Sequence, residues 1–161
     1  MNVITKPTIY LAGPLNFDSE EDFNRAVNWR EKFTEDFKDD FKILNPLKKI
    51  SGEKNISDED RVLLYESHKV NNDVTVRDFS SNIIETDLEH VVNSDYVILH
   101  LPLKSDYELC GTYGEATLAF YLGIPVIVVS DREIRDIPKW LIGCSTVILK
   151  SFGELYDYIL K

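Results

Sequence analysis

With 161 residues, the chain is large enough for one domain with a substantial hydrophobic core, and we expect residues 1–161 to form a single domain. Its formal net charge of −10 argues against polymeric nucleic acid as a partner, because phosphate binding requires a basic face, although a single nucleoside is not excluded. The sequence has no long apolar segment and no signal-peptide block, so we expect no membrane contact and a cytoplasmic location.

The cysteines and histidines do not point to a metal. Cys110 and Cys144 lack the spacing of metal ligands, and so do the three histidines. The turn after the first predicted strand has neither a dinucleotide fingerprint nor a P-loop. We therefore expect no metal and no cofactor.

The first strand and the first helix follow from their flanking residues. Thr8–Ala12 is a compact apolar run followed by Gly13 and Pro14, which predicts a strand that opens into a loop. The acidic cluster after this loop predicts a helix that runs to about Phe37, since acidic residues are favourable at a helix N-terminus. Arg30 falls in the middle of that helix's apolar arc, where a guanidinium must be paired. We rank a structural ion pair slightly ahead of a role in the site.

The segment between the second strand and the next long helix is unusual in length. Lys42–Pro46 predicts the second strand, and residues 57–65 have the pattern of a short helix. Residues 47–79 are longer than an ordinary connector, so we expect them to cover the binding pocket. The next helix is predicted over 82–93. Asp87 lies inside its apolar arc and in mid-helix, where it cannot cap, so it must be paired or functional.

A strand–helix–strand unit forms the centre of the prediction. Apolar runs at 96–101 and 126–129 flank a helix predicted over 111–123, which is apolar almost all round and should be largely buried. Glu115 lies in the first turn of this helix. Thr112 and Glu115 match a capping box, in which the glutamate would only complete the hydrogen bonds of the helix N-terminus. The carboxyl ends of parallel strands are also where ligands bind, so both interpretations stay open.

A helical turn, a fifth strand and a C-terminal helix are predicted over 138–140, 146–149 and 152–160. Five strands interleaved with helices predict a doubly wound α/β sandwich with helices on both faces. We expect a parallel sheet of order 2-1-3-4-5, because right-handed crossovers then cover both faces. Its switch point lies between the first and third strands, where Tyr10, Gly13, Asp87 and Glu115 converge.

Three motifs occur together, in order and at suitable spacing: Thr8–Gly13, Asp87–Asp95 and Gly111–Glu115. The set resembles the nucleoside 2-deoxyribosyltransferase family, including its relatives that hydrolyse the N-glycosidic bond of nucleoside monophosphates. The resemblance covers roughly residues 8–149 and implies a flavodoxin-like sandwich. It also implies that Glu115 is the nucleophile, that Tyr10 orients it, and that Asp87 is the acid that assists departure of the base.

The chemistry of these residue types suits such a reaction. Cleavage of an N-glycosidic bond passes through an oxocarbenium-like state that a carboxylate can stabilise or trap. The nucleophile must stay ionised, and a helix N-terminus favours an anion by roughly 0.3–1 kcal/mol. Asp87, on a desolvated face, would have a raised pKa, which suits an acid. The residues expected to bind substrate are Gly13, Pro14, Gly111, Thr112, Asp106, Glu108 and Arg30.

Two departures from the transferase pattern leave the reaction open. The resemblance implies an aspartate six residues before the nucleophile, where this chain has Leu109, and a polar residue from a neighbouring subunit, where it has Pro138. Transfer of a deoxyribosyl group to another nucleobase is our first hypothesis. The alternatives are hydrolysis of nucleoside 5′-monophosphates, with the phosphate held by Arg30, Arg77 or Lys48, and a module that senses a nucleotide without turnover.

The expected partners are a small nucleoside or nucleotide, a free nucleobase and further copies of this chain. The resemblance implies that a neighbour's C-terminal region covers the site, and Ile137–Ile142 is the matching segment. Its aromatic and aliphatic residues are typical of interface cores. We therefore expect a homo-oligomer, a dimer or larger, with Trp140 near the partner's pocket. Packing of the same residues on their own sheet is an alternative of equal weight.

Overall fold

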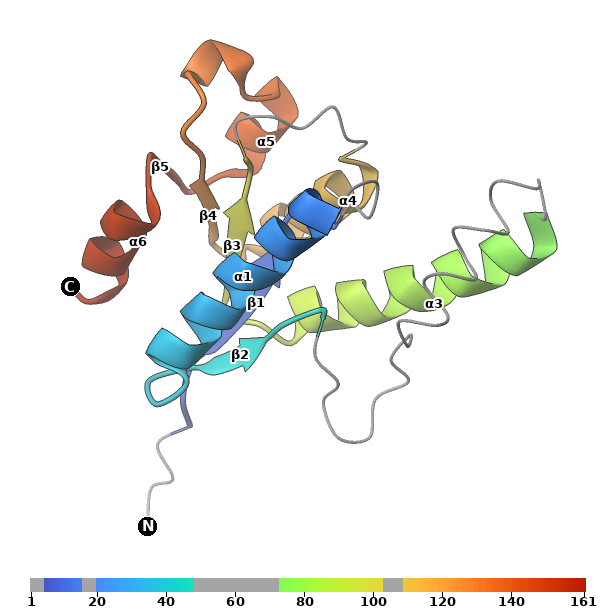
Figure 1. Ribbon diagram of the computed structural model, residues 1–161, viewed down its shortest axis with the longest axis horizontal. Coiled ribbons are helices and arrows are strands. Elements are labelled where there is room, and N and C mark those ends of the chain that lie inside the picture. Colours follow the sequence, from blue (N-terminus) through green and yellow to red (C-terminus); the bar gives the residue numbers. More distant parts are fainter. Residues whose placement is uncertain (1–4, 16–19, 48–72, 103–108) are drawn as a thin grey trace.

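The computed structural model describes residues 5–15, 20–47, 73–102 and 109–161. Five parallel strands form one sheet of order β2-β1-β3-β4-β5, as predicted (Figure 1). They are β1 (Thr8–Ala12), β2 (Lys42–Leu44), β3 (Tyr96–His100), β4 (Val126–Val129) and β5 (Val147–Leu149). Tyr10 of β1 is paired with Leu44 on one side and with Val97 on the other, which places the switch point between β1 and β3.

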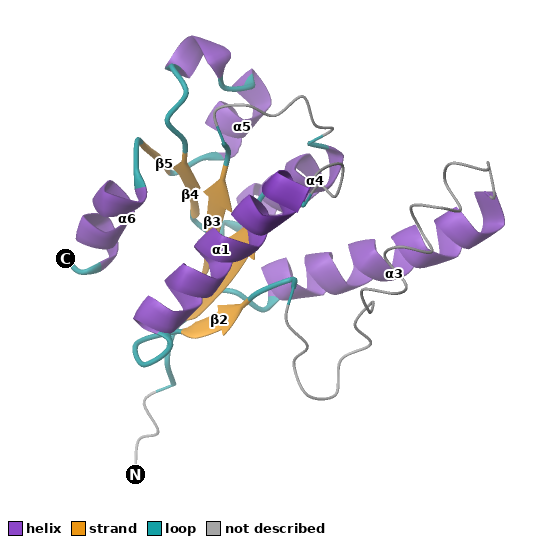
Figure 2. Cartoon of the chain, in the orientation of Figure 1, coloured by secondary structure: helices purple, strands orange, loops and turns teal. Residues whose placement is uncertain are grey.

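Helices cover both faces of the sheet (Figure 2). They are α1 (Glu20–Phe37), α3 (Asp73–Val92), α4 (Cys110–Leu122), α5 (Lys139–Cys144) and α6 (Phe152–Ile159), with a 3₁₀ turn at Ile134–Asp136. Alternate strand residues enter two separate cores. Tyr10 and Leu99 pack with α3, α4 and α5, on what we call the α4 face. Ile9 and Leu11 pack with α1 and α6, on what we call the α1 face. The doubly wound, flavodoxin-like prediction is confirmed.

The helix predicted over 82–93 is longer than expected. It begins at Asp73, so the prediction of an irregular connector up to residue 79 is wrong for its last seven residues. The N-terminal half of α3 extends away from the sheet (Figure 1), and Val74 there is 64% exposed. A helix exposed to water on most sides needs no apolar stripe, so hydrophobic periodicity could not reveal it. The helix predicted over 57–65 lies outside the described residues.

The prediction that α4 is largely buried is only partly correct. The helix packs on the sheet through Ala116 and Ala119, but Phe120, Tyr121 and Leu122 are 60%, 83% and 46% exposed. Small side chains face the strands because the helix lies close to them, and the large side chains of the last turn point outward. These exposed apolar side chains leave an apolar surface next to α5.

The helical turn predicted over 138–140 is a longer helix, α5, which runs to Cys144. The remaining differences are at element ends, where a shift of one or two residues is usual. β2 ends at Leu44 instead of Pro46, β3 ends at His100, β5 begins at Val147 and α4 begins at Cys110. Among the described residues, no helix has the length and apolar character needed to span a membrane.

Candidate active site

A buried tyrosine–glutamate pair lies where β1 meets α4. Tyr10 and Glu115 are 105 residues apart in sequence, yet the Tyr10 hydroxyl donates a hydrogen bond of 2.6 Å to Oε1 of Glu115. Tyr10 is fully buried and Glu115 is 7% exposed. The second carboxylate oxygen, Oε2, is also buried and has no hydrogen-bond partner among the described residues. One oxygen is therefore held in place, while the other keeps unused hydrogen-bonding capacity.

Of the two interpretations of Glu115, the capping box does not hold. The residue that caps α4 is Leu109, and it makes no side-chain hydrogen bond there. Since the helix starts at Cys110, Glu115 lies beyond the first turn, and its carboxylate is turned towards Tyr10. Thr112 is buried on the same helix. The electrostatic benefit of a helix N-terminus is largest within the first turn, so Glu115 receives less of it than expected.

Burial controls the charge of Glu115. Desolvation, followed by the nearby negative charge of Asp87, raises the pKa of Glu115 from 4.5 to about 8. The hydrogen bond from Tyr10, the positive charge of Arg30 and the Gly13 backbone N–H all lower this pKa, but by less. A carboxyl group with this pKa holds its proton at neutral pH. Burial and the charge of Asp87 therefore oppose the ionised form of Glu115 that the helix N-terminus was expected to favour.

Tyr10 keeps its own proton. Burial, and then the charges of Glu115 and Asp87, raise the pKa of Tyr10 well above 10. A phenol of this kind donates a hydrogen bond throughout the neutral range and cannot act as a base. Beneath it, the ring of His90 lies 5.6 Å from the Tyr10 ring, measured between centroids. Tyr10 is thus packed into a single orientation toward Glu115.

Asp87 approaches the pair from α3. Its side chain is half-buried, and its charge raises the pKa of both Tyr10 and Glu115, so it lies close to each of them. The structure therefore brings together Tyr10, Asp87 and Glu115, from β1, α3 and α4. This is the convergence at the switch point that the topology predicted. Two carboxyl groups in one apolar setting cannot both ionise easily, which is a common arrangement in acid–base sites.

Arg30 holds the backbone next to the site in place. It is fully buried on α1, and its guanidinium donates to the backbone carbonyls of Leu11, Gly13 and Ala26 at 2.9–3.2 Å. The guanidinium carbon also lies 4.6 Å from the centre of the Trp29 ring. The described hydrogen bonds of Arg30 go to these carbonyls, and the expected contact with substrate does not fit a side chain that is fully buried. Arg30 instead fixes the turn after β1.

Gly13 allows that turn to lie directly against β3. Its φ of +132° is rarely adopted by other residues, and a Cβ here would lie 2.6 Å from the His100 carbonyl oxygen. Pro14 follows and is half-buried. Gly111, by contrast, is exposed, and a Cβ there would meet nothing within 4 Å. A close approach of backbone to backbone is therefore seen at Gly13 and not at Gly111.

We expect Gly13→Ala to destabilise the protein and to reduce any activity of the site. The strained backbone costs on the order of 1–3 kcal/mol, and the clash with the His100 carbonyl shifts the turn that Arg30 holds. Thermal unfolding should show a clear decrease in Tm. Gly111→Ala is the matched control and should be neutral or slightly stabilising, because alanine favours a helix. Equal Tm values for the two variants would contradict this account of Gly13.

Some predicted site residues are placed elsewhere or are not described. Asp106, Glu108 and Lys48 lie outside the described residues. Arg77 is exposed on the projecting half of α3, 3.9 Å from Asp73. His90 is the one contributor that sequence reasoning missed, because we considered histidines only as metal ligands. Its position three residues after Asp87 would have placed it on the same helix face.

No protein-family model matches the chain, and no curated protein matches it. Solved structures do match. A 2-deoxyribosyltransferase from Bacillus psychrosaccharolyticus aligns with a TM-score of 0.60 and 20% identity, over 94% of this chain and 91% of that chain. The two chains share one fold. A conserved protein from Enterococcus faecalis V583 aligns with a TM-score of 0.61 and 17% identity, over 95% of this chain and 96% of that chain.

The likeness to the deoxyribosyltransferase confirms the fold that the motifs implied. Leu109, which stands where the resemblance implies an aspartate, is only 8% exposed and belongs to the α4-face core. Pro138, which stands where it implies a polar residue, is half-buried at the start of α5. In this chain both positions are occupied by apolar residues.

Proposed function

We propose that this protein cleaves the N-glycosidic bond of nucleosides, with Glu115 as the nucleophile. The observation that carries the proposal is the asymmetry of the Glu115 carboxyl group: Oε1 accepts from Tyr10 at 2.6 Å, and buried Oε2 has no hydrogen-bond partner among the described residues. A carboxylate that is oriented through one oxygen can attack through the other once a substrate reaches it. The shared fold with a 2-deoxyribosyltransferase supports the same class of substrate.

The raised pKa of Glu115 fits this role once Asp87 is considered. The charge of Asp87 is the second cause of the shift, and this contribution disappears when Asp87 is protonated. The charge on Glu115 therefore depends on whether Asp87 is ionised. We propose that the reactive form has the proton on Asp87 and the negative charge on Glu115. That form provides a nucleophile and an acid together.

The reaction then balances in two steps. Oε2 of Glu115 bonds to C1′ while the bond from C1′ to the base nitrogen breaks, and the leaving base takes the proton of Asp87. In the second step an acceptor displaces Glu115 from C1′ and returns a proton to Asp87. Tyr10 remains a hydrogen-bond donor to Oε1 throughout. Two displacements at C1′ retain the configuration of the sugar.

The acceptor is either a second nucleobase or water. Transfer to a nucleobase remains our first proposal. Hydrolysis is the second candidate, and the specific observation in its favour is that Leu109 is packed into the core, so it cannot contact a sugar as an aspartate could. Hydrolysis of a 5′-monophosphate would also require a phosphate-binding group. The hypothesis of a module that senses a nucleotide without turnover treats Glu115 as a helix cap. Glu115 does not cap α4, so this hypothesis loses its main support.

Incubation with deoxyinosine, with and without free adenine, tests the proposal. Formation of deoxyadenosine means transfer, and release of hypoxanthine without exchange means hydrolysis. The same assay with deoxyinosine 5′-monophosphate tests the need for a phosphate. If neither product forms although the nucleoside binds, the protein is a sensor and the catalytic proposal is wrong.

We also propose that the chain forms a homo-oligomer through its α4 face. Trp140 is 61% exposed, although its indole N–H donates to Thr117 of α4 at 2.7 Å. Beside it lies an apolar cleft of about 590 Å³. Its lining residues are Leu88, Tyr113, Gly114, Thr117, Leu118, Tyr121 and Trp140. The segment Ile137–Ile142 offers less surface to a neighbouring copy than predicted, because Ile137 and Leu141 are buried in the core of their own chain. Within this segment, Trp140 is the large apolar side chain that stays exposed.

We expect Tyr121→Asp to dissociate the oligomer. Tyr121 is 83% exposed at the rim of this cleft, so a charge there opposes burial against a second copy without disturbing the fold. Light scattering at micromolar concentration should give a species larger than 18.6 kDa for the unmodified chain and 18.6 kDa for the variant. Tyr158→Asp, at an exposed aromatic residue of α6, is the control. A monomeric unmodified chain would refute the assembly.

A further inference from the structure

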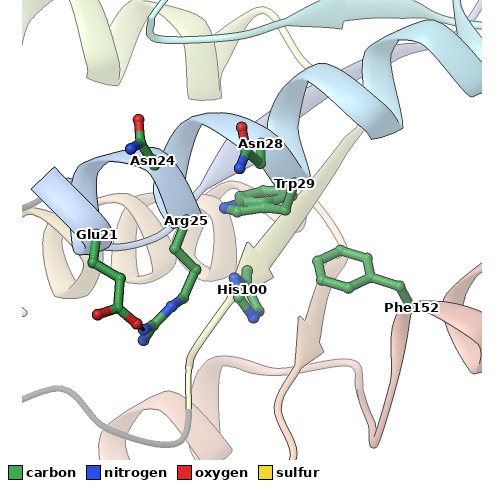
Figure 3. Close-up of a pocket in the computed structure, with 7 residues that line it drawn as sticks. All are labelled: Glu21, Asn24, Arg25, Asn28, Trp29, His100 and Phe152. Atoms are coloured by element: carbon green, nitrogen blue, oxygen red, sulfur yellow. Dashed lines mark hydrogen bonds and ion pairs between the residues drawn. The ribbon is translucent and has the colours of Figure 1, made fainter.

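A second cleft lies on the α1 face, at the carboxyl end of β3. It has a volume of about 690 Å³, within the usual range of roughly 300–1,000 Å³ for small-molecule sites. Its lining residues are Glu21, Asn24, Arg25, Asn28, Trp29, His100 and Phe152 (Figure 3). A neighbouring hollow of about 550 Å³ shares Arg25, His100 and Phe152 with it, so the two hollows adjoin.

This cleft is separate from the Tyr10–Glu115 pair. Successive residues of a strand point to opposite faces, and Leu99 of β3 belongs to the α4-face core. His100 therefore points to the other side, where it contacts α1 and α6. The described lining of the cleft includes neither Tyr10 nor Glu115. A ligand here would lie across the sheet from the proposed reaction.

Three aromatic rings form the base of the cleft. Trp29 comes from α1, His100 from the end of β3 and Phe152 from the start of α6 (Figure 3). The Trp29 ring centre lies 5.4 Å from that of His100 and 5.6 Å from that of Phe152, and His100 lies 5.0 Å from Phe152. The rings hold one another in place, and the Arg30 guanidinium covers one face of Trp29, 4.6 Å from the ring centre. The remaining ring surface gives the cleft an apolar aromatic wall.

His100 adds hydrogen-bonding capacity without charge. Burial, and then the positive charge of Arg30, lower the pKa of His100 to about 4. The imidazole is therefore neutral near pH 7, with one ring nitrogen that donates and one that accepts. Asn28, exposed on α1, brings an amide that also does both. A ligand with adjacent donors and acceptors on a flat ring matches this set.

The charges around the cleft are balanced. Arg25 is paired with Glu21 at 2.9 Å, and Lys150 donates to the backbone carbonyl of Arg132. Asp131 provides a second negative charge on the same rim. Among the described residues that line the two hollows, two acidic and two basic side chains give no net attraction for an anion. The cleft is therefore better suited to an uncharged ligand than to a phosphate.

We propose that this cleft binds an uncharged nitrogen heteroaromatic ring, a purine or pyrimidine base, stacked on Trp29 and Phe152 and hydrogen-bonded by His100 and Asn28. This inference goes beyond the proposed reaction and does not depend on it, because it stands on the cleft alone. The base belongs either to a free nucleobase or to a nucleoside. Comparison of adenine with adenosine distinguishes these sources.

Trp29 fluorescence gives a direct test. The chain has two tryptophans, so Trp140→Phe leaves Trp29 as the only one. Titration with adenine or adenosine should quench its emission and reach saturation below about 1 mM. Phe152→Ala should weaken binding roughly 10-fold, in line with the loss of one stacking partner. Asn28→Ala should also weaken binding, whereas Glu31→Ala, an exposed α1 residue outside the cleft, should not change it.

Glu115→Ala in the same Trp140→Phe background separates the two sites. It is expected to abolish turnover while leaving the quenching intact, so failure of the proposed reaction and failure of this cleft are distinguishable. The proposal is overturned if no saturation is reached, if Glu115→Ala removes the signal, or if inorganic phosphate competes with adenine. Equilibrium dialysis of adenine on the unmodified chain and on Asn28→Ala provides the same comparison without the Trp140 substitution.

Discussion

Glu115→Gln is expected to eliminate base release and, at the same time, to raise the stability of the protein above pH 8. Glutamine keeps the shape of the side chain and can still accept from Tyr10, but it cannot form a bond to C1′. We expect turnover to fall on the order of 1,000-fold or more, as for loss of other catalytic nucleophiles.

The stability effect follows from the pKa of Glu115, which folding raises from 4.5 to about 8. Between these pH values the folded state holds a proton that the unfolded state has lost. The free energy of unfolding therefore decreases as the pH rises, by up to about 1.4 kcal/mol per pH unit. This contribution is complete below pH 4.5 and is lost above pH 8. Glutamine stays neutral, so the variant avoids the loss.

Thermal unfolding from pH 5 to 9 measures this difference. The Tm of Glu115→Gln should exceed that of the unmodified chain at pH 8.5, and the two should converge near pH 5. Glu85→Gln, at an exposed position of α3, is the control and should follow the unmodified chain at every pH. A folded Glu115→Gln protein with substantial activity would refute the assignment of the nucleophile.

Asp87→Asn is expected to reduce turnover on the order of 100- to 10,000-fold for bases that are poor leaving groups. Asparagine has a similar shape but no proton to give to the departing base. Substrates with activated leaving groups need this proton less and should lose less activity. Since the charge of Asp87 also raises the pKa of Glu115, the variant should titrate Glu115 at a lower pH.

Kinetics with a series of leaving groups, together with the pH dependence of kcat, checks this assignment. Asp78→Asn, an exposed aspartate on the same helix, is the matched control and should change neither. A uniform decrease for all leaving groups, accompanied by a lower Tm, would mark Asp87 as a purely structural residue. The dependence on leaving-group ability is therefore the decisive measurement.

The sequence alone determined the sheet. Each strand is a short apolar run with turn residues on both sides. These local features can be recognised without knowing which residues pack against them. The order β2-β1-β3-β4-β5 followed because handedness leaves few ways to connect such runs. The same rules placed Tyr10, Asp87 and Glu115 at one edge, since the carboxyl ends of parallel strands meet there.

The tertiary structure decided the chemical state of those residues. The pKa of Glu115 depends on burial and on Asp87, which is distant in sequence, so a local capping pattern predicted the wrong environment. Arg30 found its partners in backbone carbonyls, which carry no sequence signature. The ring contacts among Trp29, His100 and Phe152 join three elements, so the sequence of no single element predicts them. Sequence patterns record local preference, whereas desolvation and long-range contacts arise only when the chain has folded.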